Sequence, residues 1–126
     1  MRLLVQCLMV GAGGFLGAVA RFLVSMFCGR ALGTAFPIGT LVVNLSGSMF
    51  LGWFLTVIRQ RTIVSDNTRL AIAVGFVGAY TTFSTFMLES GSLLEDGSGI
   101  KAMLNLLGSV MLGLFAVRAG IWLGAR

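Results

Sequence analysis

Four long stretches with almost no charged residues divide the chain, and this pattern limits it to one kind of fold. The stretches run over about residues 3–27, 38–58, 69–88 and 102–123. A helix needs about 20 apolar residues to cross the ~30 Å hydrocarbon core of a bilayer. A helix also satisfies its own backbone polar groups inside lipid. The sequence therefore predicts an all-α membrane protein with four transmembrane helices, forming a single domain over residues 1–126.

Charge and composition exclude several classes of function. Nine Lys and Arg oppose four Asp and Glu, and the basic residues lie mostly at the ends of the stretches. Such an excess indicates membrane topology and contact with anionic lipid headgroups rather than nucleic acid. The chain has no histidine, and Glu89, Glu95 and Asp96 lie at or beyond the end of a stretch. Because no buried nucleophile–base pair or carboxylate pair is visible, we do not expect an enzyme.

Four spans place both termini on the same side of the membrane. With Arg21 and Arg118 left out, the positive-inside rule mildly favours cytoplasmic termini. The residues counted on that side are Arg2, Arg59, Arg61, Arg69 and Arg126, against Arg30 and Lys101 opposite. The start of the chain also has a second interpretation as a secretory signal, with a cleavage-like Ala18-Val19-Ala20. Cleavage there would discard Gly13 and Gly17, which are spaced for close helix packing.

The third stretch contains a segment that is unusual for a lipid-facing helix. Residues 75–86 read GFVGAYTTFSTF, with two glycines, four Ser or Thr hydroxyls and four aromatic rings. Irregular backbone at membrane depth persists where it is buried in protein or lines a wet cavity. We therefore predict that this helix is broken near its middle, between Gly78 and Thr81. A broken helix presents carbonyls to a hard cation and an N-terminal end to an anion, whereas a simple glycine kink would bind no ion.

Three further positions suit an anion path. Phe83 and Phe86 are three residues apart and share one helix face, where their ring edges carry positive quadrupole density. Their alternative role is plain packing. Asn44 is the one amide inside the second stretch, and such a group is costly in hydrocarbon unless it is hydrogen-bonded or wet. We expect it either to join two helices or to face a polar passage.

These segments together resemble the CrcB/Fluc family of fluoride channels. The segment over residues 75–86 followed by Glu89 is similar to the family's third helix, and PIGTLVVNLSGS over residues 37–48 to its second. The glycine-rich first stretch with Arg21 is similar to its first helix. The resemblance implies a dual-topology dimer of oppositely inserted subunits with two fluoride pathways. It also implies passive export of fluoride from the cytoplasm across the bacterial plasma membrane.

The resemblance also assigns roles to residues of the pathway. The path would be lined by the residues Asn44, Phe83, Ser84, Thr85 and Phe86. On the fourth helix, Ser109 is the match to a hydroxyl of the polar track, and Gly113 stands where a second hydroxyl is expected.

The remaining implied roles are structural. Backbone carbonyls of Gly78 and Thr81 would hold a structural Na⁺ at the centre of the dimer. Arg21 would support the pore helices from behind, although by its position alone it could equally snorkel to the interface. Glu89, expected at the end of the span near water, would be a second supporting residue. The partner would be a second copy of the chain or a homologous subunit.

Two other classes of membrane protein fit these residues less well. A small multidrug exporter would need a carboxylate deep in a span, and the first two stretches contain none. A non-transporting assembly subunit would explain the glycine spacing but not the combination of Asn44, Phe83 and Phe86. The sequence therefore favours the channel.

Overall fold

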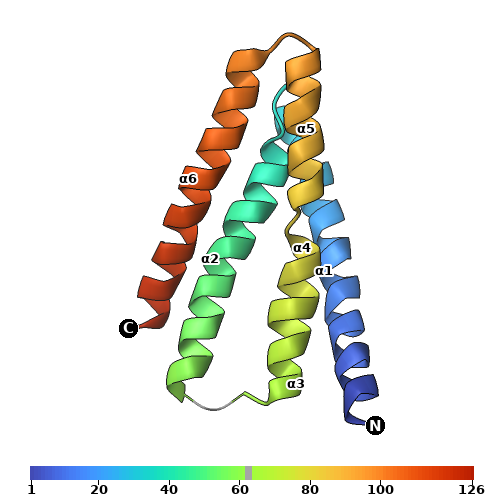
Figure 1. Ribbon diagram of the computed structural model, residues 1–126, viewed down its shortest axis with the longest axis vertical. Coiled ribbons are helices and arrows are strands. Elements are labelled where there is room, and N and C mark those ends of the chain that lie inside the picture. Colours follow the sequence, from blue (N-terminus) through green and yellow to red (C-terminus); the bar gives the residue numbers. More distant parts are fainter. Residues whose placement is uncertain (62–63) are drawn as a thin grey trace.

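A computed structural model describes residues 1–61 and 64–126 of the chain, and the described part is helical (Figure 1). Among the described residues, four helical segments are long and apolar enough to cross a membrane, which confirms the predicted all-α, four-span fold. Three of them are single helices: α1 (Arg2–Leu32), α2 (Ile38–Arg61) and α6 (Gly99–Gly124). The third span consists of α3 (Asp66–Arg69), the π-helical η1 (Leu70–Val77), α4 (Gly78–Tyr80) and α5 (Phe83–Glu95).

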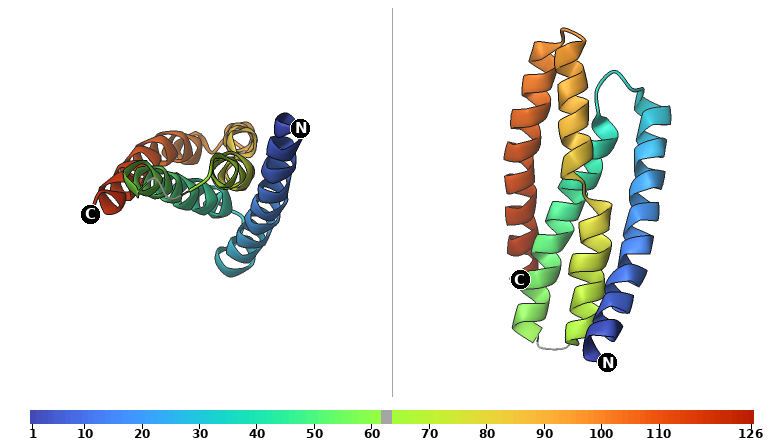
Figure 2. Two further views of the ribbon diagram at one scale, coloured as in Figure 1. Left: turned by 90° about the horizontal axis from the view of Figure 1, so that it is seen from below. Right: turned by 45° about the vertical axis from the view of Figure 1, so that its right-hand side comes forward.

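The third span packs between α1 and α2, and α6 packs against the far side of α2 (Figures 1 and 2). Helices α2 and α6 run in the same direction, and both chain termini lie at the end of the molecule where α2 finishes. The turn between α5 and α6 and the connection from α1 to α2 lie at the opposite end.

Glycines let the backbones of neighbouring spans touch. A Cβ added at Gly13 or Gly17 of α1 would collide with the carbonyls of Ala71 and Phe76 in η1. A Cβ at Gly120 of α6 would collide with the carbonyl of Met49 in α2 in the same way. Small residues permit this close approach in membranes, where dispersion contacts between helices drive association. The predicted packing role of Gly13 and Gly17 therefore agrees with the structure.

The third span is longer than the sequence indicated. It continues to Glu95 rather than ending at Leu88, so Ser90 and Ser92, expected in a polar loop, are helical. Both hydroxyls donate to carbonyls four residues back, at 2.7 and 3.1 Å, so their O–H groups are paired within the helix. Helix α5 ends where Gly97 adopts a left-handed φ of 73°, a conformation that favours glycine after a helix.

The break in the third span lies at Thr81 and Thr82 rather than between Gly78 and Thr81. Thr81 has ψ 157° and Thr82 has φ −150° and ψ 124°, whereas Gly78 is helical. Thr82 then caps α5, because its Oγ1 accepts the Thr85 N–H at 3.3 Å. The prediction of a break near the middle is confirmed, and its cause is hydroxyl capping rather than glycine flexibility.

Candidate functional site

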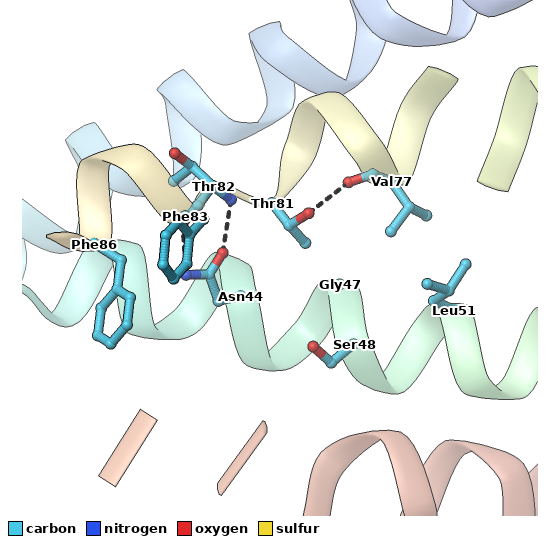
Figure 3. A pocket seen from close by; sticks show the side chains of 9 residues that line it. All are labelled: Asn44, Gly47, Ser48, Leu51, Val77, Thr81, Thr82, Phe83 and Phe86. Carbon is cyan, nitrogen blue, oxygen red and sulfur yellow. Dashed lines mark hydrogen bonds between the residues drawn. The ribbon is translucent and has the colours of Figure 1, made fainter. Parts of the chain in front are cut away.

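A cavity of about 260 Å³ lies where α2 passes the break in the third span (Figure 3). It is open on one side of the single subunit. Residues of α2 form one wall and residues around the break form the other. The lining residues are Asn44, Gly47, Ser48, Leu51, Val77, Thr81, Thr82, Phe83 and Phe86.

Asn44 joins α2 to the broken segment. Its Oδ1 accepts the Thr82 N–H at 2.8 Å and its Nδ2 donates to the Thr82 carbonyl at 3.0 Å (Figure 3). An amide group has two N–H donors, so one is left for a ligand. Asn44 thus joins two helices, which is one of the two predicted roles, and it also lines the cavity. Its place in a polar passage stays a prediction. Thr82 is not among the predicted site residues, although a hydroxyl residue in a predicted break is a natural helix cap.

Phe83 and Phe86 both line the cavity, but they differ in burial. Phe86 is 6% exposed, whereas Phe83 is 73% exposed in the single subunit. Their ring centroids are 6.2 Å apart with an edge-on angle of 60°. The structure therefore brings Asn44, Phe83 and Phe86 together at one cavity.

Ser84 and Thr85 lie on α5 next to these rings but do not line the cavity. Both are exposed in the single subunit. The hydroxyl of Thr85 accepts a hydrogen bond from Thr82 Oγ1 at 3.1 Å, so it is part of the N-terminal cap of α5. Their place in a polar track stays a prediction.

Ser109 belongs to a chain of hydrogen bonds between α6 and α5. Ser109 Oγ donates to Asn105 Oδ1 at 3.4 Å, and Asn105 Nδ2 donates to Ser90 Oγ at 2.9 Å. Ser90 Oγ in turn donates to the Phe86 carbonyl. Ser109 therefore reaches the cavity through Phe86 rather than lining it. Asn105, 2% exposed, was not identified from the sequence, although it is the one amide of the fourth stretch.

The break also changes the partners of the backbone carbonyls before it. In an unbroken helix the Thr82 N–H would bond the Gly78 carbonyl, but here it donates to Asn44. Gly78 is exposed, and a Cβ added there would meet no atom within 4 Å. Arg21 of α1 donates from Nη1 to the Thr81 carbonyl at 3.5 Å. The guanidinium thus contacts the break from the side of α1.

The sequence placed Glu89 at the end of the third span, but the structure places it inside α5. It lies within α5, half-buried, and its Oε1 accepts the hydroxyl of buried Thr40 at 2.8 Å. This contact ties α5 to the start of α2. Its Oε2 is also buried, with no donor among the described residues. The apolar stretch ends at Leu88, whereas α5 continues to Glu95, and the position of Glu89 was therefore not predicted.

Comparison with known proteins gives one family and a group of relatives. Residues 8–121 match a family model described as "CrcB-like protein, Camphor Resistance". A protein of Methylococcus capsulatus named "Fluoride-specific ion channel FluC" is 48% identical over 116 residues, covering 92% of this chain and 49% of the relative. Proteins of the same name from Chlorobium phaeobacteroides and Hydrogenovibrio crunogenus are 46% and 47% identical, over 90% and 92% of their lengths. The chain therefore spans about half the length of the first relative (49%) but most of the other two.

Proposed function

The chain belongs to the CrcB-like family, and from this premise we infer that it is a fluoride-specific ion channel of the bacterial plasma membrane. Fluoride is its transported substrate, and the protein is a multi-pass membrane channel rather than an enzyme. A passive pathway suits fluoride export, because a membrane potential negative inside drives an anion outward by about 2.3 kcal/mol per 100 mV.

The observation that supports this function is the cavity at the start of α5. Its walls present the amide of Asn44 and the rings of Phe83 and Phe86, none of which carries a formal charge. The N-terminal end of α5 adds a partial positive charge at the same place. Amide N–H groups, ring edges and a helix N-terminus all interact favourably with an anion. The site therefore suits a small anion that must be bound weakly enough to leave.

The open side of this cavity supports the proposal that a second subunit completes the pathway. Phe83, a large apolar ring of the site, is 73% exposed in the single subunit, and Gly78 is also exposed, with no atom within 4 Å of an added Cβ. An antiparallel dimer would close two such cavities and create two pathways. The second subunit is either another copy of this chain or a homologous subunit.

A structural Na⁺ at the dimer centre is part of the same proposal. The carbonyl of Gly78 has lost its helical donor to Asn44, and an exposed backbone oxygen of this kind suits a hard cation. The Thr81 carbonyl, the second proposed ligand, is shared with Arg21. When bound, the ion would neutralise the partial negative charge at the C-terminal end of α4. The two carbonyls would hold the ion, while Asn44 keeps the Gly78 carbonyl free.

Fluoride efflux from liposomes that contain the purified protein tests the channel, with chloride efflux as the control. We expect fluoride to leave and chloride to be retained. Replacing Phe83 or Phe86 by isoleucine removes the ring edges but keeps apolar volume, and should suppress fluoride efflux while the assembly stays intact. Chloride efflux equal to that of fluoride would contradict the selective channel. Unchanged efflux in both variants would show that the rings only pack.

A further inference from the structure

A second cavity lies farther along α2 and shares one lining residue with the first. It has a volume of about 600 Å³, lies between α2 and α6, and is lined partly by Leu51, which also lines the first cavity. Val117 and Ile121 of α6 form one wall. The α2 wall changes from apolar to polar along its length, from Leu55 to Thr56, Arg59 and Gln60.

Both cavities follow one face of α2. Asn44, Ser48, Leu51, Leu55 and Arg59 recur at intervals of three or four residues and therefore share a face of the helix. Asn44 and Ser48 line the first cavity, Leu55 and Arg59 line the second, and Leu51 lines both. At 1.5 Å per residue, the face extends about 22 Å from Asn44 to Arg59. It thus leads from the break in the third span to the end of α2.

An anion that reached this end of α2 without a nearby cation would be repelled. The last turn of a helix carries unpaired carbonyls and a partial negative charge. Arg59 lies in the last turn of α2, is exposed, and lines the cavity itself. Its formal charge exceeds the partial charge of the helix end and makes the opening electropositive.

We propose that the cavity between α2 and α6 is the anion vestibule of the channel, with Arg59 raising the local fluoride concentration at its opening. Thr56, one turn before Arg59 on α2, and Gln60, next to Arg59, supply neutral polar groups to the same cavity. The proposal rests on the fluoride channel inferred above. Arg59 would act by steering: a charge at the mouth of a low-dielectric cleft raises the rate at which counter-ions enter.

The test measures fluoride efflux from liposomes of neutral lipid for Arg59→Gln and Arg59→Lys, at several ionic strengths set with an impermeant salt. Arg69→Gln is the matched control, because Arg69 is exposed at the same end of the molecule but lies outside the cavity. At about 10 mM ionic strength, where the screening length is about 30 Å, Arg59→Gln should reduce efflux about two- to fourfold. Arg59→Lys and Arg69→Gln should match the unsubstituted protein.

The dependence on salt separates steering from a structural role. At about 1 M salt the screening length is about 3 Å, and Arg59→Gln should then equal the unsubstituted protein. An equal deficit at every ionic strength, or no deficit at low salt, would overturn the proposal. A deficit that appears only in vesicles rich in anionic lipid would also overturn it, since Arg59 would then bind a lipid phosphate. Absence of fluoride efflux from the unsubstituted protein would contradict the channel itself, and the vestibule with it.

Discussion

The hydrogen bonds between Asn44 and Thr82 hold the third span open, so replacing Asn44 by alanine should both weaken the fold and close the break. The substitution removes two bonds of 2.8 and 3.0 Å and leaves the N–H and carbonyl of Thr82 without these partners. An unpaired buried polar group costs about 1–3 kcal/mol. Hydrogen bonds between helices inside membranes contribute about 0.6 kcal/mol each on average. For two groups we therefore expect a cost of about 2 kcal/mol.

The freed Thr82 N–H has one natural alternative partner, the Gly78 carbonyl four residues earlier, and that bond restores a continuous helix. A bias of about 2 kcal/mol changes the ratio of broken to continuous helix about thirtyfold. Fluoride efflux from liposomes should fall by at least about tenfold, since the cavity also loses its amide.

Ser46→Ala is the matched control for this substitution. Ser46 lies on the same helix, with its Oγ 2.9 Å from the Tyr80 hydroxyl, but it does not line the cavity. Its loss should leave efflux within about twofold, because an exposed hydrogen bond contributes little. If Asn44→Ala retained efflux within the same margin while its thermal unfolding midpoint was unchanged, the argument that Asn44 holds the break would be refuted.

Two further predictions concern the α5–α6 pair and the orientation of the chain. Asn105→Ala should lower the thermal unfolding midpoint of the assembly, because it removes a buried bond to Ser90 and leaves a void, together costing about 2–3 kcal/mol; an unchanged midpoint would count against the hydrogen-bonded chain. Ser98→Cys in a background with Cys7 and Cys28 replaced by alanine should be labelled mainly from outside the cell by an impermeant maleimide, since the arginine excess lies at the other end of the molecule. Equal labelling from both sides would refute the charge argument, whereas the expected excess would favour a homologous partner subunit over a second copy.

The four spans could be predicted from the sequence because the signal is local. A run of about 20 apolar residues identifies a membrane helix without knowledge of its neighbours. The length of α5 could not be predicted in this way, because Ser90 and Ser92 look like loop residues until their hydroxyls are seen to bond the helix backbone. The polar composition of residues 89–95 was therefore compatible with a helix as well as a loop.

The site was predictable where one residue was chemically unusual for its setting. Asn44 is the single amide of its stretch, and the structure places it beside Phe83 and Phe86. Ser84 and Thr85 illustrate the limit, because the position at which α5 restarts decides which of its residues face the cavity. That position depends on the bond from Thr82 to Asn44, which joins residues 38 apart in the sequence.

The break gives the third span two helix ends of opposite partial charge at membrane depth, which one continuous helix would not provide. Its carbonyl end, at α4, has a partial negative charge, and its amide end, at α5, has a partial positive charge. Conduction requires that an ion be bound firmly enough to enter and weakly enough to leave, so partial charges suit the pathway better than a formal one. The formal charges of the described residues near this path follow the same rule. Arg21 contacts the break from α1, and Arg59 lies at the end of α2, so neither lines the cavity where Asn44 and the phenylalanines meet. Replacing Ser48, which lines this cavity, by a positively charged residue should therefore slow fluoride efflux, because the formal charge would hold the anion in place.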